Sequence, residues 1–300
     1  DRGAFAILHE KPLGRNYPAV ACVQVRDSRM AMSRLAAAFY GRASSALVTI
    51  GVTGTEGKST TVYLIYQLLN LAGLKTGFFS TVMSDTGQGE IPNPEHQTTP
   101  ESTAVQRMLA EMRDSGCCCA VVEASSHGLS QRTARLADVD FDIAVMTNVT
   151  SEHLEFHGTW ERYRSDKANL FRNLDAHDHR KNPPHPGWEG AKAIPSFAIV
   201  NADDPSAEYF GLSTGKPLLS FSVRGGRASI VAKNIRSDGR GSSFVIEGSR
   251  ILLDAPPEAG RIEAEARIEL PGQFNVGNSL AALAVASCVL DRPWTGLLEL

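Results

Sequence analysis

One stretch, a glycine-rich loop between an apolar run and a helical pattern, constrains the fold of this chain more than any other. Residues 46–51 read ALVTIG, and residues 58–72 (KSTTVYLIYQLLNLA) place apolar side chains at helical spacing before Gly73. In this order, the N–H groups of the loop and of the helix start face an anion, a lysine reaches its outer oxygens, and a hydroxyl can ligate Mg²⁺. Lys58 and Ser59 fit the last two roles. The stretch therefore predicts a strand, a phosphate-binding loop and a helix.

The loop departs from the common phosphate-loop pattern at one position. G-x-x-x-x-G-K-[ST] would place its first glycine at residue 52, where Val52 stands, and Gly51 comes one residue early. An ordinary glycine-rich turn is the alternative, but the order of strand, loop and helix favours nucleotide binding. The residues expected to contact the nucleotide are Thr53, Gly54, Thr55, Glu56, Gly57, Lys58 and Ser59.

Further apolar runs alternate with helical patterns along the chain. Strands are predicted at 75–81, 117–123, 141–148 and 197–204, and a helix begins near Pro100 and runs to about Asp114. Such alternation predicts an α/β fold whose mostly parallel sheet is flanked by helices. Residues 228–270 read as short strands that form a small antiparallel excursion from the α/β pattern. Residues 275–290 read as a helix.

Composition excludes several classes of protein. The 30 Lys and Arg against 33 Asp and Glu give a net charge of −3 with no basic run, so we expect no nucleic acid partner. We find no apolar stretch of about 18 residues and no signal-peptide pattern, so we expect a cytoplasmic protein without a membrane partner. The 5 cysteines form neither a disulfide framework nor a zinc pattern, and Cys117, Cys118 and Cys119 read as small apolar residues of a buried strand.

Two segments read as loops. Residues 82–99 are polar and contain Gly and Pro. Residues 175–195 are rich in Pro and His, and we expect an exposed, mobile insertion there. A metal-binding tract formed by its three histidines is the alternative.

The spelling T-G-T-x-G-K-[ST] of the loop resembles the Mur ligase family, the ATP-dependent amide-bond-forming enzymes of peptidoglycan precursor synthesis. Family members usually carry Asn where this chain has Glu56, and a carboxylate there is costly beside phosphates unless it points to solvent or to the metal. The resemblance continues through HQTTPES at 96–102, EASSHGL at 123–129, TNVTSEHLEFHG from 147, NADD at 201–204 and GQFNVGNSLAALA at 272–284.

The resemblance assigns substrate contacts. In the branch of the family that adds the third residue of the stem peptide, the TTP segment contacts UDP-MurNAc-dipeptide. The usual arginine of the following motif would stand at Thr133, and Arg132, one residue earlier, is taken as its replacement. The implied contacts are Gln97, Thr98, Thr99, Ser125, Gln131 and Arg132.

The resemblance also assigns the metal, carbamate and adenine positions. An acid at the carboxyl end of a parallel strand faces the ligand crevice, and the resemblance implies that Glu123, Ser59 and His153 hold Mg²⁺. It makes Lys167 the lysine that is carbamylated, where sequence alone indicates a solvated helix lysine. Asn275 and Asn278 lie one helical turn apart, able to face adenine or the neighbouring loop, although Asn275 also suits an N-cap. Lys58, Lys167 and His153 are thus the implied catalytic residues.

The implied domain is the central ATP-binding domain, over residues 46–290. We expect residues 1–45 to be a remnant of an N-terminal UDP-binding domain, and 291–300 to begin a linker to a C-terminal domain absent from this fragment. The implied activity is addition of a diamine amino acid, such as diaminopimelate or lysine, to UDP-MurNAc-L-Ala-D-Glu. It uses ATP and Mg²⁺ and passes through an acyl phosphate, in an enzyme expected to be monomeric. Another amide ligase of the superfamily, of folylpolyglutamate or cyanophycin type, and a non-catalytic nucleotide-binding regulator remain open alternatives.

Overall fold

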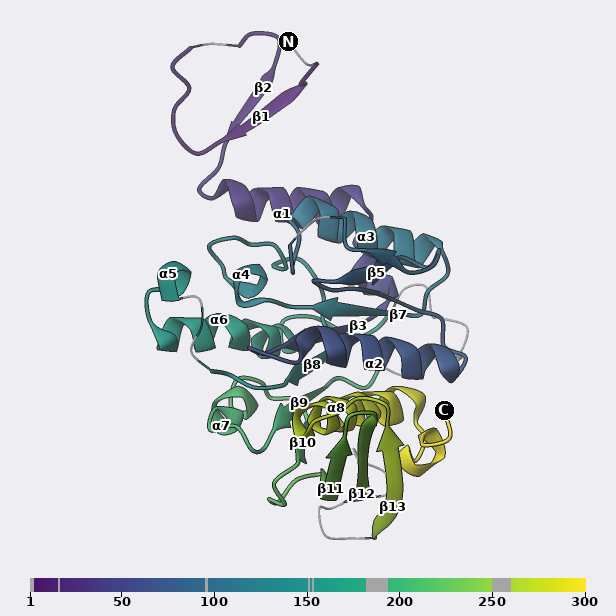
Figure 1. Ribbon diagram of the computed structural model, residues 1–300. Helices are drawn as coiled ribbons and strands as arrows, with labels where there is room; N and C mark the ends of the chain where they lie inside the picture. Colours follow the sequence, from purple (N-terminus) through teal and green to yellow (C-terminus); the bar gives the residue numbers. More distant parts are fainter. Residues whose placement is uncertain are drawn as a thin grey trace.

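The computed structural model describes residues 3–15, 17–94, 97–150, 152, 154–181, 194–249 and 260–300. Within them, eleven strands form one sheet in the order β13-β12-β11-β10-β9-β8-β3-β7-β4-β5-β6 (Figure 1). The strands are β3 (Val48–Thr53), β4 (Thr76–Phe79), β5 (Met83–Asp85), β6 (Ile91–Pro92), β7 (Cys119–Glu123), β8 (Ile143–Met146), β9 (Phe197–Asn201), β10 (Leu218–Ser222), β11 (Ile230–Asp238), β12 (Gly241–Ser249) and β13 (Arg261–Ile268).

The centre of the sheet is parallel, as the sequence predicts. Strand β3 pairs with β7 on one side and with β8 on the other, both in parallel. The carboxyl ends of these three strands therefore meet at one edge, where an open α/β sheet binds its ligands. The predicted strands near 46, 75, 117, 141 and 197 are confirmed, whereas β10, which is parallel to β9, was missed.

Helices cover both faces of the sheet. Helices α2 (Lys58–Leu71) and α8 (Gln273–Leu290) share one apolar cluster with β3 side chains such as Val48, Ile50 and Val52. Helices α3 (Ser102–Asp114) and α6 (Trp160–Asn173) share the other cluster, which includes Val122 and Met146. Alternate strand residues point to opposite faces, so one set of strands supplies both cores.

Helix α8 corrects one expectation about apolar length. It spans 18 residues and is apolar enough to cross a membrane by length and composition, but 72% of that span is buried inside the protein. A helix that is apolar on all sides is typical of a buried core position, and α8 packs against α2. It is a core helix of the fold.

At the two outer sides of the sheet, one prediction is corrected and one is confirmed and extended. The segment 82–99 is not wholly loop, because β5 pairs with β4 and β6 pairs with β5, both antiparallel. The predicted antiparallel excursion is confirmed for β11, β12 and β13. It continues the main sheet, since β11 pairs in parallel with β10.

The N-terminal segment forms elements that the sequence did not predict. Strands β1 (Ala6–His9) and β2 (Ala21–Gln24) form a parallel pair that projects from the body, and α1 (Ser28–Phe39) packs against α3 (Figure 1). The shorter helices are η1 (Ala43–Ala46), α4 (Ser126–Leu129), α5 (Leu154–His157), α7 (Ala207–Gly211) and η2 (Trp294–Leu297).

The expectation of an exposed insertion at 175–195 holds for Asp175, Ala176, Asp178 and Arg180 but is wrong for two side chains of its first part. His179 is only 7% exposed and the Lys181 side chain 4%, because both reach Asp142 at the start of β8. Residues 182–193 lie outside the described part of the chain.

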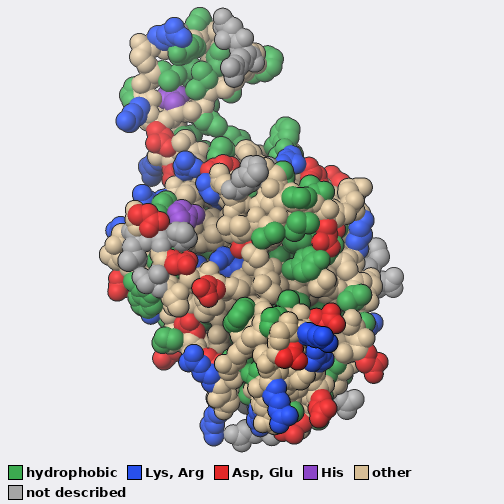
Figure 2. Space-filling view, in the orientation of Figure 1, with side chains coloured by type: hydrophobic (Ala, Val, Ile, Leu, Met, Phe, Trp, Pro, Cys, Tyr) green, Lys and Arg blue, Asp and Glu red, His purple; other side chains and the backbone are tan. Residues whose placement is uncertain are grey.

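Two surface and core features agree with the sequence. Cys117, Cys118 and Cys119 are buried, as expected, and burial raises the pKa of the Cys117 thiol to about 11. On the face drawn in Figure 2, acidic and basic side chains are interspersed, with no basic stripe.

Candidate functional site

The loop between β3 and α2 depends on two glycines with positive φ. Gly54 has φ 152° and passes so close to Thr147 that a Cβ would collide with its side chain. Gly57 has φ 80°, caps α2 and lies against the Asn278 side chain. Gly51, by contrast, lies inside β3 beneath Leu170 and Phe141, so it belongs to the core and not to the loop. Gly51 is therefore not the first glycine of the phosphate-loop pattern displaced by one residue, because close packing against Leu170 and Phe141 accounts for a glycine at this position.

The charged residues of the loop point in different directions. The Lys58 Nζ donates to Thr55 O at 2.8 Å, which folds the ammonium over the loop at the start of α2. Glu56 is exposed and receives contacts through its backbone. The carboxylate at this position is therefore solvated, the arrangement that limits its repulsion of phosphate.

The segment after β8 holds the loop in place. Thr147 Oγ1 donates to Glu56 O at 2.6 Å, and Asn148 contacts the same residue through both its amide oxygen and its amide nitrogen. Asn201 and Asp204 of the NADD segment in turn bind the backbone of residues 147–149. The distant NADD motif thus supports the phosphate loop through one intermediate segment.

Glu123 lies at the carboxyl end of β7 and is 1% exposed. Its carboxylate accepts from Ser59 Oγ at 2.8 Å, from Thr81 N at 2.7 Å and from Thr81 Oγ1 at 3.0 Å. These donors are uncharged, and a buried carboxylate held by neutral donors is stabilised further by a cation. Carboxylate and hydroxyl oxygens are also the ligands that Mg²⁺ prefers. The residues present therefore fit a magnesium ion held by Glu123 and Ser59.

Lys167 is 2% exposed, which corrects the alternative of a solvated helix lysine. Its Nζ donates to Gly54 O at 2.5 Å and lies 4.6 Å from the centre of the Tyr163 ring. Burial, aided by the Lys58 ammonium, lowers the pKa of Lys167 well below its usual range. Burial also raises the pKa of Tyr163 to about 12, so its phenol, 3.0 Å from Thr55 Oγ1, is neutral.

A cavity of about 360 Å³ joins the loop to the predicted substrate segment. Thr99 organises one wall, because its hydroxyl donates to Glu123 O at 2.9 Å and accepts from the Ser125 N–H and hydroxyl. The residues that line the cavity include Lys58, Gln97, Thr98, Thr99, Ser125 and Lys167. The structure thus brings together six of the residues that the sequence nominated.

The remaining nominated substrate residues lie elsewhere. Gln131 is exposed and borders a different hollow, against α1. The Arg132 guanidinium stacks on Phe156 at 4.7 Å and donates to its carbonyl at 2.7 Å. His153, which the resemblance nominated for the metal, lies outside the described residues.

Sequence reasoning missed Arg135, which lines the cavity. Ala134 has φ 52°, and the chain beyond it leads to Arg135, whose guanidinium donates to Thr99 O at 2.9 Å and to Glu101 at 2.7 Å. Its Nε is buried without a hydrogen-bond partner among the described residues. The spacing R-T-A-R was visible in the sequence, but the left-handed Ala134 was not.

Asn278 faces the phosphate loop and Asn275 supports it. Helix α8 is capped by Gly272, so the alternative that Asn275 serves as its N-cap is wrong. Its amide instead donates to Pro271 O at 2.8 Å, and its oxygen lies 3.3 Å from the Asn278 amide nitrogen. The pair thus orients the Asn278 amide beside Gly57.

His157, adjacent to this region, has a structural environment. It is 2% exposed, with Nδ1 2.8 Å from Asp166 Oδ2 and Nε2 3.0 Å from Ser126 Oγ. Both ring nitrogens are therefore engaged, and His157 ties α5 to α4 and α6.

The sequence profile of the Mur ligase middle domain matches residues 52–286. The chain belongs to the Mur ligase family. The match begins in the last two residues of β3 and runs through most of α8.

Individual Mur ligases resemble the chain over nearly its whole length. It is 50% identical to the UDP-N-acetylmuramyl-tripeptide synthetase of Treponema denticola, covering 97% of this chain and 54% of that protein. It is 39% identical to the UDP-N-acetylmuramoyl-L-alanyl-D-glutamate–2,6-diaminopimelate ligase of Geobacillus kaustophilus, covering 94% and 52%. A solved structure of a ligase of that second name matches with a TM-score of 0.75 at 26% identity, covering 98% and 53%. The chain spans about half the length of the curated relatives it matches.

Proposed function

We propose that the protein containing this chain is the Mur ligase that adds the third amino acid to UDP-MurNAc-L-Ala-D-Glu, using ATP. The observation that carries the proposal is the single cavity that joins Lys58 and Lys167, beside the phosphate loop, to the TTP segment and Ser125. The names of the two curated relatives support the choice of substrate, since one is a UDP-N-acetylmuramyl-tripeptide synthetase and the other a UDP-N-acetylmuramoyl-L-alanyl-D-glutamate–2,6-diaminopimelate ligase. Cytoplasmic location and a monomeric state remain expectations of the proposal.

The proposed reaction has two group transfers. A carboxylate oxygen of the D-glutamate attacks the γ-phosphorus of ATP, the bond from that phosphorus to the β–γ bridging oxygen breaks, and ADP leaves. The amine of the incoming amino acid then attacks the acyl carbon, the carbon–oxygen bond to phosphate breaks, and the amine loses a proton. The peptide bond and inorganic phosphate are the products.

The phosphate loop has the groups needed for the first transfer. The N–H groups at the start of α2 and the Lys58 ammonium can hold the β- and γ-phosphates, and they act where charge develops on the transferred group. We assign Glu123 and Ser59 to Mg²⁺, which when bound would neutralise phosphate charge. Thr81 keeps the Glu123 carboxylate oriented toward Ser59.

Lys167 suits the carbamate role that the family resemblance implies. Only an uncharged amine adds to CO₂, and the buried position lowers the pKa of Lys167 toward that form. The product would be a carboxylate lying between the phosphate loop and the cavity, on the same side as Glu123. We propose that it positions the metal or the substrate carboxylate there.

Arg135 is the arginine that we assign to the substrate. It lines the cavity beside Thr99, whereas Arg132 stacks on Phe156 away from it. Glu101 and Thr99 hold its guanidinium in place while Nε keeps an unused donor. An arginine with preset geometry is suited to a carboxylate or phosphate group.

The domain organisation is proposed from the same relatives. We assign residues 1–45 to the end of an N-terminal UDP-binding domain and 46–290 to the ATP-binding domain, with 291–300 leading toward a C-terminal domain. We propose that the identity of the added amino acid depends on that further domain, because we assign the cavity to the nucleotide and dipeptide sides of the reaction.

Turnover by the intact protein tests the proposal. Phosphate release is measured with ATP, Mg²⁺ and UDP-MurNAc-L-Ala-D-Glu against a panel containing diaminopimelate, lysine and ornithine. We expect release that requires both the dipeptide and one member of the panel, with a tripeptide product. Turnover with folate and glutamate would support the folylpolyglutamate alternative. Nucleotide binding without turnover on any substrate would support the regulator.

A further inference from the structure

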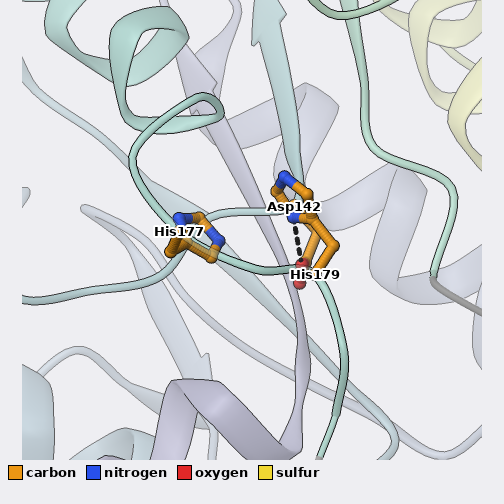
Figure 3. Close-up of side chains that lie close together, drawn as sticks. All are labelled: Asp142, His177 and His179. Carbon is orange, nitrogen blue, oxygen red and sulfur yellow. Dashed lines mark hydrogen bonds and ion pairs between the residues drawn. The ribbon is translucent and has the colours of Figure 1, made fainter.

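A second cluster of polar side chains lies at the amino end of β8, at the opposite end of the strands from the phosphate loop. Asp142 directly precedes β8, and His177 and His179 follow the end of α6 (Figure 3). The three residues each offer one ligand atom, and these atoms all lie within 4.8 Å of one another. Asp142 is separated from Thr147, beside the phosphate loop, by the length of β8, roughly 16 Å at about 3.3 Å per residue. The cluster is therefore distinct from the nucleotide site.

Backbone carbonyls fix the orientation of both imidazoles. His177 Nδ1 lies 3.1 Å from Asn173 O, and His179 Nε2 lies 2.8 Å from Leu174 O. A carbonyl oxygen only accepts, so each of these nitrogens carries a hydrogen. In the neutral form of each ring, the lone pair is then on His177 Nε2 and on His179 Nδ1. Metal-binding histidines are held in this way, with the second ring nitrogen donating to a backbone carbonyl.

In that form, neither lone pair faces a hydrogen-bond donor among the described residues. His177 Nε2 is buried and has no partner among the described residues, and in Figure 3 the ring lies beside the Asp142–His179 pair. His179 Nδ1 lies 3.0 Å from Asp142 Oδ1. Two acceptors opposed at this distance repel each other unless a proton or a metal cation lies between them.

We propose that Asp142, His177 and His179 bind one divalent transition-metal ion, and that zinc is the best match. Two imidazoles and a carboxylate are common zinc donors at about 2.0–2.2 Å, and three protein ligands leave a fourth position for water. Asp142 Oδ1 is available for this bond, because Oδ2 accepts from Thr49 N at 2.8 Å and pairs with Lys181 at 2.5 Å. The ligand atoms close in around the ion from their present separations.

Lys181 opposes metal binding and so provides an internal control. Its side chain is 4% exposed, and its ammonium, placed on the same carboxylate, repels a second cation. The ion binds in competition with this contact. Replacing Lys181 with methionine removes the competing charge while keeping most of the buried volume, so it strengthens metal binding.

The bound ion would tie the end of α6 to the start of β8. Asn173 already joins these elements, accepting from Phe141 N at 2.9 Å and donating to Val139 O at 3.0 Å. The metal adds a link at His177 and His179, four and six residues beyond Asn173. It has a structural role, independent of the chemistry proposed for the cavity.

Metal uptake by the intact protein tests the site. The protein is stripped with a chelator and titrated with Zn²⁺ and, separately, with Co²⁺, whose visible absorption reports ligand type and geometry. Isothermal titration gives stoichiometry and Kd, and circular dichroism checks the fold of each variant. His177→Gln and His179→Gln are compared with His9→Gln, a histidine near the N-terminus that lies outside the cluster.

We expect one ion per chain in the parent and in His9→Gln. Loss of either ligand is expected to weaken binding by roughly 100-fold or more, since loss of even a supporting residue costs 10–100-fold. Lys181→Met binds more tightly than the parent. The proposal is overturned if folded His177→Gln and His179→Gln proteins bind zinc as the parent does, or if neither the parent nor Lys181→Met binds it. Because no nucleotide or ligase substrate is used, the result does not depend on the proposed function.

Discussion

The buried amine of Lys167 leads to a prediction about the pH dependence of stability. Its pKa in the folded chain is lowered by burial, whereas the unfolded chain has the ordinary lysine value of about 10.4. Between these two pKa values the unfolded state binds the extra proton, so the free energy of unfolding rises with pH. The stability of the parent is therefore reduced progressively as pH falls from about 10.4 toward the folded pKa, and the reduction is constant below it.

Lys167→Met removes this dependence. One proton corresponds to about 1.4 kcal/mol per pH unit, so lowering the pH from about 9 to about 7.5 should cost the parent up to about 2 kcal/mol relative to the variant. The variant also loses the hydrogen bond to Gly54 O. This loss lowers its free energy of unfolding by about 1–3 kcal/mol at every pH, so it shifts the plot of stability against pH without changing its slope. Methionine fills most of the same volume, so little cavity is left.

Urea denaturation at a series of pH values measures the difference. Buffers are kept free of CO₂ so that the amine is unmodified, and the exposed Lys11 supplies the control variant Lys11→Met. We expect the Lys11→Met and parent curves to stay parallel, while the Lys167→Met curve diverges in slope. Parallel curves for the parent and Lys167→Met would show that the amine titrates equally in both states, and the burial argument would fail.

Three further predictions concern the intact enzyme. Lys58→Ala should weaken ATP binding by about 10- to 150-fold in a folded protein, since a charge-assisted contact contributes about 1.5–3 kcal/mol; unchanged affinity in equilibrium binding would contradict the phosphate-loop assignment. Glu123→Gln should raise the Mg²⁺ concentration needed for half-maximal turnover far more than the KM for the dipeptide, and equal effects on both would remove it from the metal site. Arg135→Met should raise the KM for the dipeptide at least about tenfold, whereas Arg132→Met should change it less than about threefold; the reverse order would restore Arg132 as the substrate arginine.

Local patterns predicted the elements whose residues are adjacent in sequence. The strand, loop and helix from Val48 to Leu71 were predictable because apolar periodicity, two glycines and a helix start follow one another directly. The burial of Lys167 could not be predicted in this way. It depends on Gly54, 113 residues away, and a polar helix surface reads the same whether or not a loop covers it.

Other features were missed for the same physical reason. Arg135 enters the cavity through the left-handed Ala134, which no propensity favours. His179 is buried beside Asp142, 37 residues earlier, whose Oδ1 lies 3.0 Å from its Nδ1, whereas Pro and His composition alone indicates an exposed segment. Each miss is a long-range polar contact that overrides a local preference.

Helix α6 connects the two polar sites of the fold. Near its middle, Lys167 contacts Gly54 of the phosphate loop, and at its end Asn173 is fastened to the residues before β8. About 9 Å of helix separates the two positions, at 1.5 Å per residue, and a helix packed on a sheet over this length moves as a rigid body. The fastening at Asn173 therefore restricts where the Lys167 amine can lie. A buried amine keeps its lowered pKa only while water is excluded, so we expect the contacts of Asn173, which hold the end of α6, to help keep the Lys167 amine in that state beside the phosphate loop.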